Sequence, residues 1–158
     1  MNVNASLNRD ANRAIFQTNE AFQAPLAWTF AAANTGSIAQ HTLFTVTGDV
    51  ILSLFGIVNT TLTSGGASTI SAGGVGNVAA LLGVTTATNL ADGDVWVDTT
   101  DTRVGFGPLV AAHEFVCNDG LDVTIDILTA TITAGQIDFY CLYRPLESGA
   151  SVVAATPA

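Results

Sequence analysis

The sequence predicts an all-β protein, an antiparallel β-sandwich of the jelly-roll kind preceded by an N-terminal arm or short helix. From residue 38 onward, short runs rich in β-branched and aromatic residues alternate with turns that contain Gly, Asn or Asp. No convincing helical periodicity follows residue 37. The same strands could alternatively form an open β-barrel. Because 158 residues suffice for one core, we assign residues 1–37 to an N-terminal segment and residues 38–158 to one sandwich domain.

The N-terminal segment combines a helical pattern with an apolar stretch. Asn8–Gln23 has a capping asparagine, spaced apolar residues and a stop at Pro25, which together predict a short helix. Trp28 and Phe30 then follow at alternate positions. Such large apolar side chains need cover, so this stretch either folds back as a first strand or forms an arm that docks on a neighbouring subunit.

The most apolar predicted strand is Val50–Leu62, which follows the alternating run His41–Thr47 across a tight turn at Gly48-Asp49. Both of its faces are apolar, which requires cover on both sides. Its odd-numbered face consists of Ile51, Phe55 and Ile57. We expect this odd-numbered face to meet a partner or the N-terminal segment.

The middle of the chain predicts shorter elements. Ser64–Ala80 is rich in Gly, Ala and Ser and predicts a long loop with one short strand at Ser68–Ala72. Leu81–Leu90 predicts a helical turn or a short strand. Further strands are expected at Val95–Asp98 and within Leu109–Cys117, and the turn signal at residues 118–120 leads into the C-terminal region.

The C-terminal region Leu121–Ala155 predicts a β-hairpin. Two runs rich in β-branched and aromatic residues flank a Gly-containing turn at Thr133–Gln136. In the first run, the apolar residues lie at odd-numbered positions up to Ile127 and at even-numbered positions from Leu128 onward. Because such a phase slip would turn half the strand inside out, we predict a β-bulge near Asp126–Leu128.

Arg144 is one of only four arginines and lies on the face of the last strand opposite the core. We expect it to pair with Asp126 or Asp138 across the hairpin, an interaction of ~0.2–1 kcal/mol if exposed. The alternative is a contact between subunits, where its guanidinium would meet carboxylates. The same choice between core and interface applies to Trp28 and Trp96.

The composition excludes some partners. The chain has a net charge of −9, four arginines and no lysine, so it lacks the basic stripe that nucleic-acid binding needs. The longest apolar run, Val50–Val58, is far shorter than the roughly 20 residues of a membrane span. Only 11% of the residues are charged while 49% are hydrophobic. The excess apolar surface is therefore assigned to protein contacts, including self-association.

Cys117 and Cys141 are the two cysteines, and both fall in predicted strands. Two cysteines in a chain with an adequate core do not indicate a disulfide framework, so we expect buried free thiols. The polar N-terminus lacks the layout of a signal peptide, which predicts synthesis and folding in a cytoplasm.

No residues predict a catalytic or cofactor site. Gly74–Ala79 matches G-x-G-x-x-A but lacks the preceding buried strand of a dinucleotide fold. His41 and His113-Glu114 have no recognisable nucleophile beside them, so we expect no enzyme. A weak candidate for a cation site is the group of acids Asp92, Asp94, Asp98 and Asp101. These acids are otherwise expected to be solvated turn residues.

Four stretches of the chain resemble the small jelly-roll head proteins of tailed bacteriophages that decorate or cement the capsid. They read HTLFTVTGDVILSLFGIVNTTL, DGDVWVDTT, EFVCNDGLDVTIDI and ITAGQIDFYCLYRPLESGASVVAA, and the similarity covers residues 38–155. The TVTG turn and the FYCLYRPL strand with its small-residue tail carry it. The resemblance implies a location on the capsid exterior, synthesis in the host cytoplasm, a trimer, and contact with the major capsid protein.

Two functions follow as hypotheses. The first is a decoration protein that stabilises the shell by bridging its subunits, with no chemistry and no cofactor. The second is a head fibre or spike domain that binds host glycans, for which Trp96 beside Asp94 and Asp98 would supply an exposed aromatic and acids. The residues expected at interfaces are Trp28, Phe30, Ile51, Phe55, Ile57, Trp96 and Arg144.

Overall fold

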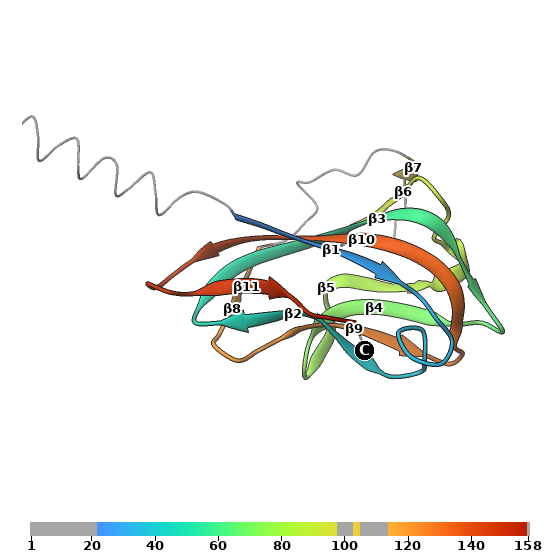
Figure 1. Ribbon diagram of the computed structural model, residues 1–158, viewed down its shortest axis with the longest axis horizontal. Helices are drawn as coiled ribbons and strands as arrows, with labels where there is room; N and C mark the ends of the chain where they lie inside the picture. The colour runs from blue at the N-terminus through green and yellow to red at the C-terminus, as the bar shows by residue number, and fades with distance from the viewer. Residues whose placement is uncertain (1–21, 98–102, 105–113, 158) are drawn as a thin grey trace, which may run out of the picture.

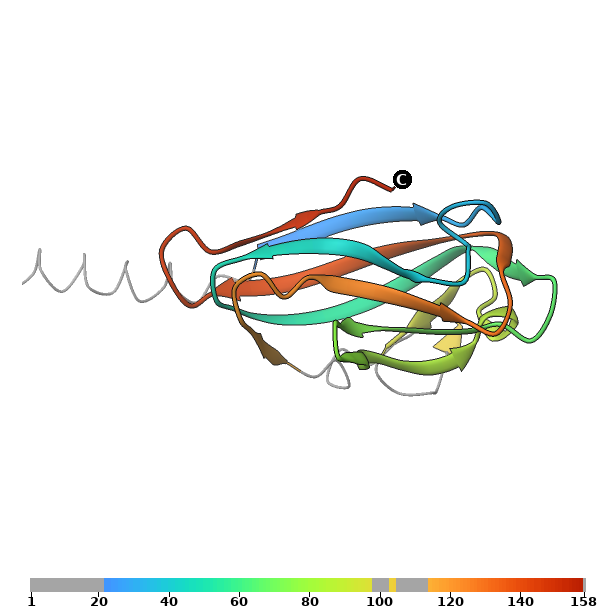
Figure 2. The ribbon, with the colours of Figure 1, turned by 90° about the horizontal axis from the view of Figure 1, so that it is seen from below.

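The computed structural model describes residues 22–97, 103–104 and 114–157. These residues are nearly all β and form two antiparallel sheets that face each other (Figure 1). In the view from below, β1 and β11 run along one side of the molecule and β4 and β5 along the other (Figure 2). The all-β sandwich predicted from the sequence is confirmed at this level. No helix among the described residues is long and apolar enough to cross a membrane.

The larger sheet has the order β1-β10-β3-β6-β7, and β8 also pairs with β3. Its strands are β1 (Phe22–Thr29), β10 (Ile132–Pro145), β3 (Val50–Ser64), β6 (Asp94–Trp96), β7 (Arg103–Val104) and β8 (Phe115–Cys117). The smaller sheet has the order β11-β2-β9-β4-β5. Its strands are β11 (Ser151–Ala154), β2 (Gln40–Thr47), β9 (Val123–Leu128), β4 (Thr69–Gly74) and β5 (Asn77–Thr86), and the 3₁₀ turn η1 (Ala87–Asn89) follows β5.

The core fills the space between the inner faces of the two sheets. Alternation along each strand sends every second side chain inward, which is why the apolar residues of β3 and β10 gather there. The ring of Trp96 packs against that of Phe139, with centroids 6.2 Å apart. In β2, a register shift between Thr42 and Phe44 lets the adjacent Leu43 and Phe44 both be fully buried. This bulge lies in β2, next to the strand in which the sequence predicted one.

The stretch that contains Trp28 and Phe30 is part of the sandwich. β1 pairs with β10 along its whole length, from Phe22 beside Tyr143 to Thr29 beside Gln136. The sandwich thus includes residues 22–37, and the domain boundary expected at residue 37 is wrong. The predicted helix Asn8–Gln23 lies outside the described residues except at its last two positions, which belong to β1.

The predicted C-terminal hairpin is wrong, because its two strands belong to different sheets. β9 ends at Leu128, and residues 129–131 carry the chain across to β10 in the larger sheet. β9 pairs with β4 without interruption, so no bulge occurs at Asp126–Leu128. The phase slip instead marks the end of a strand, where Leu128 points outward and is 48% exposed.

The predicted turn at Thr133–Gln136 lies inside β10. Register shifts against β3 occur between Ile132 and Ile137, and Gly135 has a positive φ of 126°. A Cβ at Gly135 would lie 2.8 Å from the Cα of Leu62. The glycine therefore marks a bulge that packs closely against β3 rather than a turn between strands.

The Gly48-Asp49 turn also joins the two sheets, since β2 and β3 lie in different ones. The other local predictions fare better. The short strand expected at Ser68–Ala72 is β4, and Leu81–Leu90 supplies most of β5 and the η1 turn. Of the strand expected within Leu109–Cys117, the described part is β8.

Candidate interaction surface

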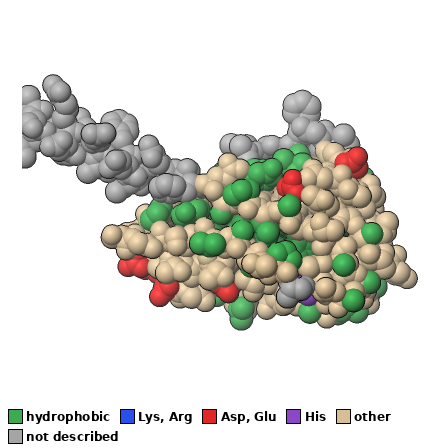
Figure 3. Space-filling model, viewed as in Figure 1, with side chains coloured by type: hydrophobic (Ala, Val, Ile, Leu, Met, Phe, Trp, Pro, Cys, Tyr) green, Lys and Arg blue, Asp and Glu red, His purple; other side chains and the backbone are tan. Residues whose placement is uncertain are grey.

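The outer face of the larger sheet carries a block of apolar side chains, all half-buried except the exposed Val116. The strand register places Tyr140 beside Phe55 and Val95 beside Ile57, while Val116 of β8 lies beside Ile51. We call this block the outer apolar face; it consists of Ile51, Phe55, Ile57, Val95, Val116, Tyr140 and Leu142. Hydrophobic side chains are visible over the region where β1, β10 and β3 run (Figure 3).

Contacts within the outer apolar face hold its side chains in place. The rings of Phe55 and Tyr140 stack with centroids 5.1 Å apart and planes 16° apart, an arrangement that favours aromatic pairs. Of this face, Val116 is the most exposed residue, at 65%. The odd-numbered face of β3 therefore points away from the core, as the alternation predicted, and within the described chain it is only partly covered.

Arg144 lies at the edge of the outer apolar face and pairs with Glu114. Its Nη2 donates to Oε2 of Glu114 at 2.7 Å, and the two side chains are 31% and 61% exposed. The predicted partners are wrong. Asp126 is in the other sheet, and Asp138 accepts hydrogen bonds from Asn59 and Gln136.

The predicted interface residues fall into two groups. Ile51, Phe55 and Ile57 are half-buried on the outer apolar face, with Arg144 at its edge. In contrast, Trp28, Phe30 and Trp96 are 2%, 3% and 1% exposed and belong to the core. The indole N–H of Trp28 donates to the carbonyl oxygen of Thr35 at 3.3 Å, which satisfies its polar atom inside the protein. Their assignment to an interface is therefore wrong.

Of the acids of the candidate cation site, Asp94 has a structural role and Asp92 contributes a backbone hydrogen bond. Asp94 is 5% exposed, and its Oδ2 accepts a hydrogen bond from the amide of Ala91 at 2.9 Å, which closes the turn before β6. The amide of Asp92 donates to Oγ1 of Thr61. Asp98 and Asp101 lie outside the described residues. Within the described ranges, no three His, Cys, Asp or Glu residues are arranged to hold a metal ion.

The glycine-rich motif Gly74–Ala79 forms the tight connection between β4 and β5. Gly76 has a φ of 91°, a conformation that suits glycine in a turn. A dinucleotide site would need a helix to follow the glycines, whereas here a strand follows. The motif is thus a hairpin turn.

The described histidine makes a local contact, and the two cysteines are buried. His41 Nε2 lies 3.1 Å from the carbonyl oxygen of Ser37. Cys117 and Cys141 are free thiols. Burial, with a smaller contribution from Cys117, raises the pKa of Cys141 to about 12, so this thiol stays protonated at neutral pH. His113 lies outside the described residues.

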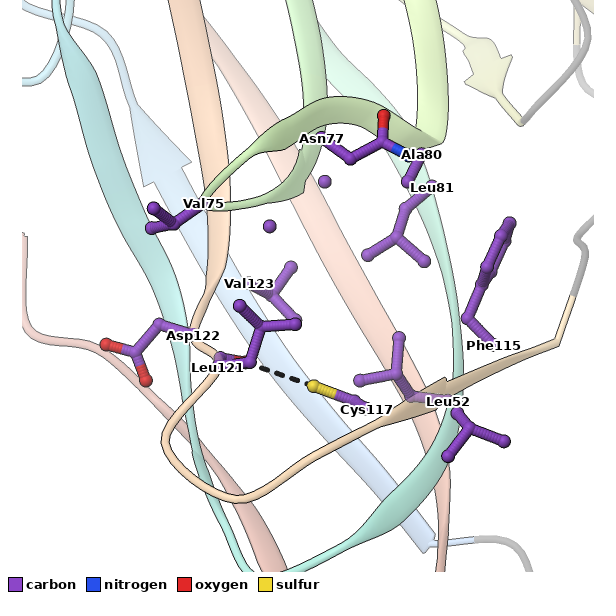
Figure 4. Close-up of a pocket in the computed structure, with 13 residues that line it drawn as sticks. Leu52, Val75, Asn77, Ala80, Leu81, Phe115, Cys117, Leu121, Asp122 and Val123 are labelled. Carbon is purple, nitrogen blue, oxygen red and sulfur yellow. Dashed lines mark hydrogen bonds between the residues drawn. The ribbon is translucent and has the colours of Figure 1, made fainter.

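The structure also contains a pocket that the sequence did not predict. This end pocket, of about 180 Å³, lies between the sheets where β4 passes into β5 and β8 into β9 (Figure 4). Its lining includes Leu52, Leu81, Phe115, Cys117 and Val123. The Sγ of Cys117 donates to the carbonyl oxygen of Leu121 at 3.0 Å. No sequence signal could reveal this pocket, because its lining comes from segments far apart in the chain.

Comparison of the chain with models of protein families, with curated proteins and with solved structures finds no match.

Proposed function

We propose that this protein is a jelly-roll decoration protein that binds the outside of an icosahedral phage capsid, as a trimer, and stabilises it by bridging copies of the major capsid protein. The observation that carries the proposal is the outer apolar face, which offers a broad apolar surface on one side of a single domain. Apolar patches of this kind mark protein contacts. The sequence resemblance to phage head proteins supplies the identity of the partner.

The charge of the chain supports the exterior of the shell as its location. A net charge of −9 without any lysine is unfavourable beside packaged DNA, whose phosphates repel acidic surfaces. The low charge content agrees with a protein whose surface is largely covered in an assembly. If a trimer attaches through all of its subunits, weak single contacts add up to tight overall binding.

The glycan-binding alternative loses the residue on which it depended. Trp96 is 1% exposed and packs against Phe139, so it is not a platform on which a sugar ring could stack. Asp94 beside it is also buried and closes a turn.

Binding to phage heads that lack the protein tests the proposal. The full chain should co-sediment with such heads, and Phe55→Asp should weaken binding by at least about tenfold, because it places a charge in the middle of the outer apolar face. Val153→Asp is the matched control, since Val153 is 60% exposed on β11 of the other sheet. Thermal unfolding of both variants separates loss of binding from loss of folding.

Two results would overturn the proposal. One is a stable monomer of the wild-type chain that does not bind the heads. The other is a folded Phe55→Asp variant that binds as well as Val153→Asp, which would remove the outer apolar face as the attachment surface.

A further inference from the structure

The end pocket has the size and lining of a site for one apolar group. Its volume is about 180 Å³, and an apolar protein cavity of ~150 Å³ is large enough to bind benzene. Leucine, phenylalanine and valine side chains form much of its wall. A Cβ added at Gly74 would lie 3.4 Å from the side chain of Leu121, in ordinary van der Waals contact with the pocket wall.

Exposed apolar side chains surround the mouth of the end pocket. Val75, in the turn between β4 and β5, is 65% exposed, and Leu121, just before β9, is 38% exposed. Figure 4 shows Val75 on the turn between β4 and β5, and Leu121 on the opposite connection, between β8 and β9, with its side chain next to that of Val123. An apolar hollow with an exposed apolar rim is typical of a surface that receives a side chain from another protein.

The same end of the sandwich is acidic. Four carboxylates there accept hydrogen bonds from backbone amides: Asp49, Asp119, Asp122 and Glu147. Asp122 also lines the end pocket. Burial, then the charges of Asp122 and Asp49, raise the pKa of Cys117, so the negative potential reaches the pocket wall. Figure 3 shows acidic side chains at the end where β10 passes into β11.

We propose that the end pocket is a second docking site, which receives an aromatic or branched aliphatic side chain of a partner protein with a basic residue next to it. The apolar side chain fills the pocket, and the basic residue lies against Asp122 and the neighbouring carboxylates. A partner with an acidic residue at that position would meet like charges, so the site selects by charge as well as by shape. This proposal does not depend on capsid attachment through the outer apolar face.

Three capped dipeptides test the site on the full chain: acetyl-Phe-Arg-amide, acetyl-Phe-Glu-amide and acetyl-Ala-Arg-amide. In methyl-detected NMR, acetyl-Phe-Arg-amide should shift the methyl signals of Leu81, Leu121 and Val123, while those of Val153, on the other sheet edge, stay unchanged. Acetyl-Phe-Glu-amide should bind roughly two- to fivefold more weakly, the range of one exposed ion pair. Acetyl-Ala-Arg-amide should leave the pocket signals in place.

Variants separate the pocket from the charge. Ala80→Phe, on the lining strand β5, should fill the pocket and abolish the shifts, whereas Ala79→Phe, at the neighbouring position that does not line the pocket, should not. Asp122→Asn should still bind acetyl-Phe-Arg-amide, but with a smaller preference over acetyl-Phe-Glu-amide. This variant tests the charge even if Ala80→Phe fails to fold. Absence of pocket shifts with acetyl-Phe-Arg-amide would overturn the proposal, as would equal binding of all three dipeptides.

Discussion

Gly135→Ala tests whether residues 133–136 lie inside β10, as the structure places them, or form an exposed hairpin turn. Gly135 has a φ of 126°, a backbone conformation that only glycine adopts without strain. Its missing side chain also makes room for β3, because a Cβ there would lie 2.8 Å from the Cα of Leu62 and 3.1 Å from its side chain. Leu62 is itself 1% exposed, so it has little space to move.

The two effects add to a large expected loss of stability. The backbone strain costs about 1–3 kcal/mol, and crowding in a packed interior costs about 1–3 kcal/mol more. Gly135→Ala should therefore lower the free energy of unfolding by about 2–6 kcal/mol. Equilibrium unfolding in urea, with the slope against denaturant checked for constancy, measures this difference.

Gly65→Ala is the control. Its backbone has no positive φ, and an added Cβ would meet no atom within 4 Å. The alanine should therefore leave stability unchanged or raise it by about 0.4–1 kcal/mol, because it restricts the unfolded chain. A loss below about 1 kcal/mol for Gly135→Ala would refute the close packing of this residue against β3.

Three further predictions concern other parts of the sandwich. The pKa of Cys141 is raised in the folded state, so the protonated thiol stabilises the fold fully below the unfolded pKa of 9.0. Between pH 9 and 12 the free energy of unfolding should fall by up to about 1.4 kcal/mol per pH unit. Urea unfolding at several pH values should show this fall in the wild type and a smaller one in Cys141→Ala. A double-mutant cycle of Arg144→Ala with Glu114→Gln should give a coupling of about 0.2–1 kcal/mol, and zero coupling would contradict their ion pair. In the same assay, Ile127→Ala should lower the free energy of unfolding by about 2–5 kcal/mol, because Ile127 is fully buried. Leu128→Ala should lower it by less than about 0.5 kcal/mol, because Leu128 is 48% exposed. Similar losses for the two variants would contradict the end of β9 at Leu128.

Local patterns in the sequence were sufficient to predict an all-β sandwich and most of its strands. Alternation in Val50–Leu62 identified β3 and its two faces, and the outward direction of Ile51, Phe55 and Ile57 followed from that alternation alone. Alternation is local, because neighbouring side chains on a strand point to opposite sides whatever the strand pairs with. The part of the candidate surface that depends on one strand could therefore be predicted.

Local patterns do not specify which strands share a sheet. A short Gly-containing turn can join partners in one sheet or carry the chain from one sheet to the other, and the local residues at Gly48-Asp49 are compatible with both. A glycine in an apolar run, such as Gly135, is likewise compatible with a turn between strands or with a bulge inside one strand. The choice depends on which inner faces fill the core together, as Trp96 and Phe139 do. That packing brings together residues far apart in the sequence. The burial of Trp28, the ion pair of Arg144 and the end pocket depend on such residues too.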